Sequence, residues 1–397
     1  MSLVFNAAAL QSAVGWVVQR LPKNAAKPVT LAVMIDPAVN NMLPLAASDG
    51  GEDARAVAPI QSGTTPDDMG RIGVPGHALA AAVKACHGDT ITVEFKEAMV
   101  EVSSAGAEFL LPKMDLTEHP MGATKALAEL PEVKATLTGE QLHWIMSNTG
   151  LAAGKDPATP QLCGVKMLFG DGKIRAAATD RMILGAIELP YEDVPQGDLL
   201  IPAAVLKTVT GHIPKDAAKV SIRWEGDDPS KMYLSLPDRA IAIGLLGQKS
   251  QFPDYERIIP NLTGAPTVFV TETGVLKQAL KQALVTSTSD DKRIEVGIND
   301  GGLALTSVNE AMFRYTGTLD ANRKGEEDLI ELNLHRLNSV VSSITSDLVV
   351  CAINGASVRL SGADLPEDSD TDFLESLSEP EGQQSVFVLP GFRNPVM

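Results

Sequence analysis

The sequence repeats one pattern six times along its length. Each copy contains a short amphipathic segment of small residues with Leu and Val, which predicts a helix, followed by runs typical of β-strands. One leucine anchors each predicted helix, and successive anchors are 61 to 70 residues apart. The anchors are Leu10, Leu79, Leu142, Leu206, Leu276 and Leu337. Such a repeat predicts that one small structural unit recurs along the whole chain.

The runs that follow the predicted helices alternate apolar and polar residues, as half-buried strands do. Residues 91–95, 99–103 and 219–224 show this alternation. Residues 294–298 and 303–307 flank the turn sequence 299–302, which predicts a hairpin. Each repeat is therefore expected to form a strand, a helix and about three further strands.

Two such repeats can share one hydrophobic core, with their helices on one face of antiparallel sheets. The sequence thus predicts an α+β fold of three similar domains. Proline-bearing links at 111–131 and 252–266 place these domains at 1–125, 126–256 and 257–397. A chain of 397 residues, 44% of them hydrophobic, is long and apolar enough for several cores.

The net charge of −17 restricts the partners of the chain. Taken as a whole, such a chain repels nucleic acid and anionic membranes, and we expect no membrane partner. Aromatic residues make up only 4%, which disfavours a stacking platform for single-stranded bases. Residues 364–381 contain eight acidic residues and no Lys or Arg, which predicts a solvated loop, with an interaction tail as the alternative.

The cysteines favour a reducing compartment. Cys86, Cys163 and Cys351 are far apart and odd in number, so they predict buried thiols and no disulfide framework. We therefore expect a cytoplasmic protein. No apolar run is long enough to span a bilayer, and the first residues do not resemble a secretory signal.

The sequence offers no local catalytic or metal-binding motif. Its six histidines show no H-x-x-x-H or H-E-x-x-H spacing, and no G-x-S-x-G is present. Residues 247–250 resemble a phosphate loop only faintly, because Gly and Lys are not adjacent and Pro253 soon prevents a helix. We predict no catalytic residue, no metal and no cofactor, which favours a binding role, while a site assembled from distant residues stays open.

Four stretches resemble one known family. Residues 251–260 (QFPDYERIIP) resemble the F-P-D-Y-x-R-h-x-P signature, where h is aliphatic, of the bacterial sliding clamp, the beta subunit of DNA polymerase III. Residues 176–184 (AAATDRMIL) resemble the A-T-D-x-x-R-L-A strand and turn of that family. Residues 162–165 resemble its L-x-G, and residues 386–390 resemble its closing strand. The resemblance covers essentially the whole chain.

This resemblance implies a DNA clamp fold and a head-to-tail homodimeric ring, with helices lining the hole and sheets outside. It implies a non-catalytic processivity factor that encircles duplex DNA without sequence preference. The partners would be the catalytic subunit of a DNA polymerase, an ATP-driven clamp loader and other proteins that carry the clamp-binding motif.

A ring can hold DNA despite the negative net charge, because encirclement needs few phosphate contacts. Outer acidic residues are also screened over about 8 Å at physiological salt. Basic residues on or beside the repeated helices are the candidates for the inner face, with ordinary solvated charges as the alternative. They are Arg20, Lys23, Lys84, Lys207, Lys277, Lys281 and Arg336.

The resemblance also implies a peptide-binding groove between the second and third domains, where aliphatic walls bury Leu or Phe of a partner. Without the resemblance, ordinary core would be the alternative. The residues carried over are Leu162, Thr179, Leu184, Pro253, Arg257, Ile258, Val388, Leu389 and Pro390.

The sequence departs from the family pattern at several places. Ile183 stands where the turn usually carries Arg, and Ala203 and Ala204 stand where relatives often carry basic residues. The tail 391–397 runs past the usual end, and the acidic stretch 364–381 resembles an insertion. These departures leave open an accessory clamp, or a clamp-like paralog that binds peptides without encircling DNA. A third alternative, an unrelated cytosolic enzyme, would need a pocket of convergent titratable groups.

Overall fold

The computed structural model describes residues 2–22, 27–48, 52–66, 68–119, 130–193, 195–247, 251–262, 264–287, 292–309, 313–364 and 384–391. Six α-helices occur in these described ranges, and each contains one of the six anchor leucines. All six leucines are buried, with at most 4% of their surface exposed. The helices are α1 (Ala7–Val17), α2 (Gly76–Ala85), α3 (Gly139–Thr149), α4 (Ala203–Thr210), α5 (Thr273–Ala283) and α6 (Leu334–Ser343).

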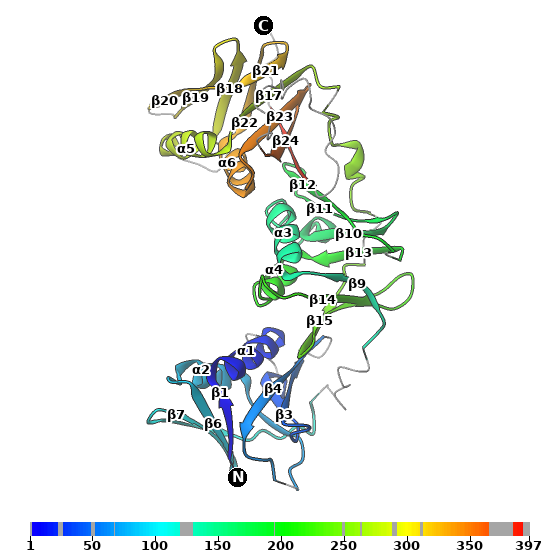
Figure 1. Ribbon diagram of the computed structural model, residues 1–397, viewed down its shortest axis with the longest axis vertical. Helices are drawn as coiled ribbons and strands as arrows, with labels where there is room; N and C mark the ends of the chain where they lie inside the picture. The colour runs from blue at the N-terminus through cyan, green and yellow to red at the C-terminus, as the bar shows by residue number, and fades with distance from the viewer. Residues whose placement is uncertain are drawn as a thin grey trace. The chain divides into compact units, whose positions relative to one another are not determined.

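The chain divides into two compact units. The first contains residues 1–143 and 205–245. Its strands form one antiparallel 12-stranded sheet, in which β8, β7, β6, β1, β4, β16, β15, β14 and β9 follow one another. Beside this path, β3 pairs with β4, β2 with β3, and β5 with β2. Figure 1 labels β1, β3, β4, β6 and β7 beside helices α1 and α2. The strands are β1 (Ser2–Asn6), β2 (Ala32–Ile35), β3 (Met42–Ser48), β4 (Asp53–Ser62), β5 (Ile72–Pro75), β6 (Thr90–Phe95), β7 (Met99–Ser104), β8 (Ala107–Pro112), β9 (Val133–Leu137), β14 (Val220–Trp224), β15 (Lys231–Leu236) and β16 (Arg239–Gly244).

Helices α1 and α2 pack side by side in this unit, and α1 also packs on β4. The start of α1 is fixed by Asn6, whose side chain accepts a hydrogen bond from the Ala9 amide at 3.0 Å. Trp16 of α1 is fully buried, and its indole N–H donates to the Ala240 carbonyl of β16 at 3.0 Å. The Arg239 guanidinium lies 5.6 Å from the centre of the Trp16 ring. The first helix is therefore fastened to a strand that follows it by more than two hundred residues.

The second unit contains residues 144–204 and 246–397. A 9-stranded antiparallel sheet runs in the order β13-β10-β11-β12-β25-β24-β23-β17-β21, beside a 4-stranded sheet in the order β20-β19-β18-β22. The first sheet comprises β10 (Gly164–Gly170), β11 (Lys173–Thr179), β12 (Leu184–Pro190), β13 (Gly197–Pro202), β17 (Thr267–Glu272), β21 (Asn322–Gly325), β23 (Leu348–Asn354), β24 (Ser357–Ala363) and β25 (Gln384–Pro390). The second comprises β18 (Arg293–Asn299), β19 (Gly302–Val308), β20 (Arg314–Leu319) and β22 (Asp328–Asn333).

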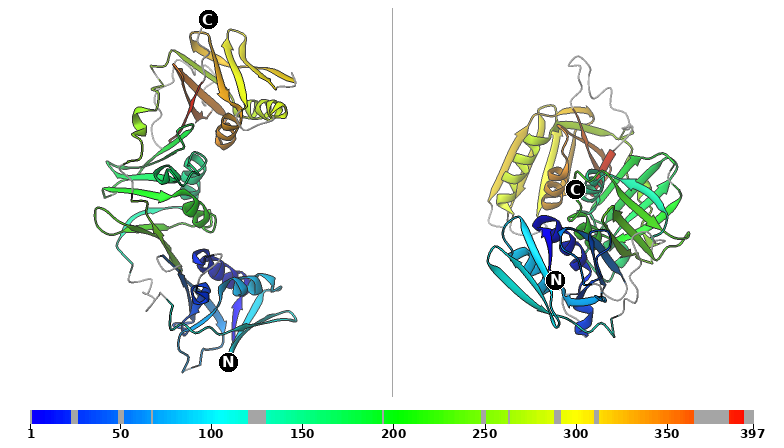
Figure 2. Two further views of the ribbon diagram at one scale, coloured as in Figure 1. Left: turned by 180° about the vertical axis from the view of Figure 1, so that it is seen from behind. Right: turned by 60° about the horizontal axis from the view of Figure 1, so that its bottom comes forward.

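Helices α5 and α6 lie side by side in this unit (Figure 1, Figure 2). Asn333 caps the start of α6, because its side chain accepts from the Arg336 amide at 3.0 Å. Elsewhere in the unit, Gly185 of β12 faces the end of α3, and a Cβ atom there would lie 2.3 Å from the Asn148 carbonyl oxygen. Glycine at this position therefore lets helix and sheet approach closely.

The strand predictions are confirmed where they are most specific. Residues 294–298 and 303–307 pair as the hairpin β18–β19, with Asn299 opposite Gly302. Two strand pairs join distant parts of the chain, namely β4 with β16 and β12 with β25. The boundaries at 125 and 256 themselves stay a prediction.

The three cysteines are free thiols. Cys86 and Cys351 are buried as expected, whereas Cys163 is half-buried, so the expectation of three buried thiols is wrong for Cys163. Its thiol donates to the Asp156 carbonyl at 3.2 Å. Among the helices in the described ranges, none has both the length and the apolar character that a membrane crossing requires.

Candidate functional site

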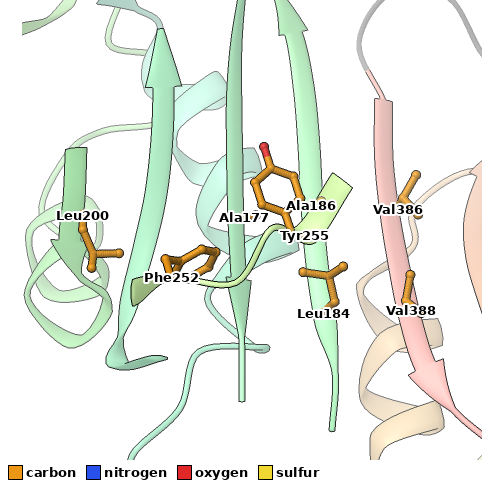
Figure 3. Close-up of a cluster of buried hydrophobic side chains, with 8 residues drawn as sticks. All are labelled: Ala177, Leu184, Ala186, Leu200, Phe252, Tyr255, Val386 and Val388. Carbon is orange, nitrogen blue, oxygen red and sulfur yellow. The ribbon is translucent and has the colours of Figure 1, made fainter. Parts of the chain in front are cut away.

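A strap of residues 251–262 covers one face of the nine-stranded sheet. Phe252 and Tyr255 of the strap pack with residues from four strands in a cluster that we call the strap cluster (Figure 3). Their rings meet edge to face, with centroids 6.4 Å apart and planes at 77°. The strand residues of the strap cluster are Ala177, Leu184, Ala186, Leu200, Val386 and Val388. Because Gly185 between two of these faces α3, the strap lies on the sheet face opposite that helix.

The sequence of the strap explains its extended course. Prolines at 253 and 260 favour extended backbone in the residues before them and remove two backbone donors. The only regular element between them is the short helical turn η6 (Tyr255–Arg257). At the far end, the buried Arg359 of β24 donates from Nη1 to the Pro260 carbonyl at 3.0 Å. The strap is therefore held at one end by aromatic packing and at the other by a buried guanidinium.

Burial raises the pKa of Tyr255 to about 12, with the neighbouring Glu256 carboxylate adding to the shift. The phenol hydroxyl has no hydrogen-bond partner among the described residues, and Tyr255 is only 6% exposed. Ionisation of this phenol would place a negative charge in an apolar cluster, where the charged form is poorly solvated and therefore disfavoured.

We expect alkaline pH to destabilise the second unit through Tyr255. The folded-state pKa lies above the unfolded value of about 10, so the stabilising contribution is complete below about pH 10 and is lost as pH rises through 12. The loss approaches roughly 2–3 kcal/mol. Urea unfolding of the wild type and of Tyr255→Phe from pH 9 to 12 measures it. Parallel stability curves for the two proteins would contradict the prediction.

The A-T-D motif forms a tight turn between β11 and β12. The Thr179 hydroxyl donates to the Ile183 carbonyl at 2.8 Å and accepts from the Arg181 amide at 3.0 Å. One Asp180 carboxylate oxygen accepts from the amides of Met182 and Ile183. The other accepts from the Arg336 guanidinium of α6 at 2.6 Å, in a pair that is about one-third exposed. The motif therefore ties a turn of the sheet to the helix layer.

Arg181 in this turn has a positive φ of 75°, in the left-handed region. A residue with a Cβ atom is less stable in this conformation by about 1–2 kcal/mol, whereas glycine is not. We expect Arg181→Gly to raise the free energy of unfolding by about 0.5–1 kcal/mol, after the greater freedom of glycine in the unfolded chain is subtracted. Met182→Gly is the matched control, because Met182 has no positive φ, and it should destabilise. Equal urea midpoints for the two variants would refute the strain.

The structure brings together three of the nine predicted groove residues directly. Leu184 and Val388 belong to the strap cluster and lie opposite each other in the β12–β25 pair. Thr179 lies opposite Leu184 in the β11–β12 pair. All three are buried. Leu389 is also buried, but it follows Val388 along the strand and so points to the other face of the sheet.

The remaining groove candidates differ in exposure. Leu162 is buried in the helical turn η4 (Pro160–Cys163), while Pro253 and Pro390 are half-buried. Ile258 is 46% exposed. Arg257 is exposed and pairs with Asp254 at 2.8 Å, an ion pair that contributes less than about 1 kcal/mol. Arg257 and Ile258 of the strap are therefore accessible to a partner, whereas Leu184 and Val388 pack beneath the strap in the strap cluster. Their role in binding stays a prediction.

The predicted DNA-facing residues fall into two groups. Lys84 of α2, Lys207 of α4 and Lys281 of α5 are exposed. Arg20 forms an ion pair with Glu52, and its side chain is only 11% exposed. Lys277 donates to the Ile344 carbonyl at 2.5 Å. Arg336 pairs with Asp180, as described above, and Lys23 lies outside the described residues.

Phe252 and Tyr255 belong to the sequence signature at 251–260, which by itself assigns them no role. The structure shows that they anchor the strap. Two aromatic residues three positions apart, on either side of Pro253, were the available signal. The Arg336–Asp180 pair had no local signal, because its members are far apart in the sequence. Within the described ranges, no group of three or more His, Cys, Asp or Glu side chains is placed to hold a metal ion.

Comparison of sequences finds curated relatives of this chain. No protein-family model matches the chain. The chain is 24% identical over 372 residues to the beta sliding clamp homolog GriR of Streptomyces muensis, covering 91% of this chain and 94% of that protein. It is 25% identical over 342 residues to the beta sliding clamp of Streptomyces coelicolor, covering 85% and 87%.

Solved structures of DNA polymerase beta subunits have the same fold as this chain. The DNA polymerase III subunit beta of Pseudomonas aeruginosa superposes with a TM-score of 0.80 at 18% identity, covering 99% of this chain and 100% of that chain. The beta subunit of Streptococcus pyogenes superposes with a TM-score of 0.82 at 17% identity over the same shares. The predicted resemblance and the predicted α+β clamp fold are confirmed.

Proposed function

We propose that this chain, a divergent relative of the bacterial beta sliding clamps, is a non-catalytic sliding clamp that encircles duplex DNA as a homodimeric ring. The observation that carries the proposal is the match of fold over 99% of this chain and 100% of the Pseudomonas aeruginosa subunit. The ring would tether the catalytic subunit of a DNA polymerase and other proteins with a clamp-binding motif. It would work in the cytoplasm and would be opened by an ATP-driven loader.

Two sheet edges that pair with no further strand among the described residues support head-to-tail assembly. Strand β8 ends the 12-stranded sheet, and β20 ends the 4-stranded sheet. Leu110 on β8 is 51% exposed, and Phe313 beside β20 is 51% exposed. An open edge with exposed apolar side chains is suited to pair with another chain. Because the two edges differ, their pairing between protomers would be heterologous, which closes into a ring when the rotation permits.

The charge pattern supports loose contact with DNA. The net charge is −17, and Lys84, Lys207 and Lys281 are the exposed cations among the described candidates. Few phosphate contacts give weak binding without sequence preference, which a sliding ring requires. Retention would then depend on topology and not on affinity.

The test of this function is retention on DNA of different topology. After incubation with a clamp loader and ATP, the protein should stay on nicked circular DNA through gel filtration and leave the same DNA once it is linearised. Equal loss from both forms would overturn encirclement.

A second candidate is a clamp-like paralog that binds partner peptides without encircling DNA. It is favoured by one observation, namely that Arg20, Lys277 and Arg336 make hydrogen bonds within the protein. This candidate predicts peptide binding at the strap together with equal loss from circular and linear DNA.

A further inference from the structure

The Arg336 guanidinium is held by a carboxylate of the β11–β12 turn. Its Nη1 donates to Asp180 Oδ2 at 2.6 Å, and the two side chains are 31% and 26% exposed. Both residues belong to the second compact unit, although they are 156 positions apart in the sequence. The sequence marks Arg336 as a DNA-facing candidate, but this contact directs its side chain to the turn that joins two predicted groove residues, Thr179 and Leu184.

Asp180 holds the main chain of this turn. Its other carboxylate oxygen, Oδ1, accepts from the Met182 amide at 2.8 Å and from the Ile183 amide at 2.9 Å. The Asp180 amide donates to the Ile183 carbonyl at 3.3 Å. Both carboxylate oxygens are therefore engaged, one by the turn and one by α6. Hydrogen bonds between charged groups are stronger than those between neutral groups, so the guanidinium fixes the carboxylate around which the turn is built.

The turn sets the positions of two predicted groove residues. Thr179 ends β11 and Leu184 begins β12, and the two lie opposite each other across the hairpin. The Thr179 hydroxyl donates at 2.8 Å to the carbonyl of Ile183, the residue just before Leu184. Arg181 between them has a φ of 75°, a conformation that persists only where surrounding contacts impose it. The shape of the turn therefore depends on the contacts that hold it.

The helix provides a fixed anchor for this contact. Asn333 caps α6 by accepting from the Arg336 amide at 3.0 Å. Leu334 and Leu337, which flank Arg336, are buried, with 0% and 4% of their surface exposed. The main chain at Arg336 is thus fixed by a cap and by core packing, and its side chain spans the distance to the turn.

We propose that Arg336 is a positioning residue of the predicted peptide groove. It does not touch the peptide. Through Asp180 it holds the turn 179–184, and with it the edge of the groove that Thr179 and Leu184 form. This role rests on the proposed function, since only a groove that binds peptides needs the turn to be held. Arg336 then belongs with the groove and not with the DNA-facing residues.

Binding of a fluorescein-labelled peptide, Ala-Ala-Leu-Ala-Leu-Phe, to the full chain tests this role by fluorescence anisotropy. Arg336→Met keeps an unbranched side chain and removes the donor, and we expect it to weaken binding about fivefold. Arg336→Lys should recover the affinity to within about twofold of the wild type, because the contact uses a single charged nitrogen. The matched control is Lys281→Met, which removes one positive charge at an exposed position of α5 and should leave the affinity unchanged.

Asp180→Asn tests whether Arg336 acts through Asp180. The side-chain amide keeps an oxygen for the turn but loses the charge, so this variant should also bind the peptide about fivefold more weakly. Adding Arg336→Met to Asp180→Asn should weaken binding by less than about twofold further, because the contact is already lost. Independent losses that multiply to about 25-fold would overturn the route through Asp180.

Amide hydrogen exchange, followed by NMR, measures the turn itself without peptide. Exchange at Met182 and Ile183 should be about fivefold faster in Arg336→Met, while the amides of the β18–β19 hairpin exchange at the wild-type rate. Unchanged exchange at the turn, equal acceleration in both regions, or faster exchange with unchanged peptide affinity would each overturn the positioning role. Wild-type protein that binds no peptide would instead overturn the proposed groove, and the role of Arg336 with it.

Discussion

Replacing Leu110 with arginine is expected to convert the proposed ring into monomers. Leu110 is 51% exposed on β8, the strand that ends the 12-stranded sheet. If this edge pairs with a second protomer, the variant loses buried apolar surface and places a charge in the interface. We expect the dimer dissociation constant to rise at least about 100-fold. Sedimentation velocity at micromolar concentration should show twice 41.9 kDa for the wild type and 41.9 kDa for Leu110→Arg.

The matched control is Val39→Arg. Val39 is 60% exposed in the same compact unit and lies in the turn between β2 and β3, neither of which pairs with β8. It should remain dimeric and be retained on circular DNA, whereas Leu110→Arg should be lost from it. A dimeric Leu110→Arg would exclude the β8 edge as the interface. A wild type that stays monomeric at micromolar concentration would refute autonomous encirclement altogether.

Phe252→Ala is expected to destabilise the second unit by about 3 kcal/mol. The ring of Phe252 fills the strap cluster together with Leu200 and Tyr255, so its removal leaves a cavity under the strap. Loosening of the strap should also weaken the binding of a partner peptide, because the predicted groove residues Pro253, Arg257 and Ile258 lie on the strap. Urea unfolding measures the first effect. Fluorescence anisotropy of a labelled peptide with Leu and Phe anchors measures the second.

Ile258→Ala distinguishes a binding residue from a packing residue on the same strap. Ile258 is 46% exposed, so the variant should change the free energy of unfolding by less than about 0.5 kcal/mol. If the predicted groove binds peptides, the affinity should nevertheless fall about tenfold. Unchanged affinity in Ile258→Ala would remove this residue from the groove. A Phe252→Ala protein as stable as the wild type would show that the strap cluster does not hold the strap.

The parts of the fold that were predictable from sequence are those written in local periodicity. The six buried leucines lie in six helices, which were predictable because helical spacing repeats every few residues and needs no distant partner. The hairpin β18–β19 was predictable for the same reason, since its turn and both strands are contiguous. The pairing of β12 with β25 was not, because Leu184 and Val388 are brought together only by the complete sheet.

In the candidate site, too, local features were predictable from the sequence and contacts between distant segments were not. The F-P-D-Y motif indicated where a special segment lies, but not that Phe252 and Tyr255 point into the sheet. Basic residues at helix positions were identified as candidates, yet the sequence carried no sign that Arg20 would pair with Glu52 or Arg336 with Asp180. Ion pairs between distant segments depend on side-chain positions that single-sequence patterns do not contain.

The strand pairs that join distant parts of the chain have a consequence for how far this protein can diverge. β4 pairs with β16, and β12 pairs with β25, through hydrogen bonds between main-chain atoms. Main-chain groups are the same whatever the side chain, so these joins constrain the spacing and alternation of residues more than their identity. Such joins can survive extensive substitution, which accounts for a shared architecture at 17–18% identity. Gly185 under α3 is one of the residues that do need a particular identity.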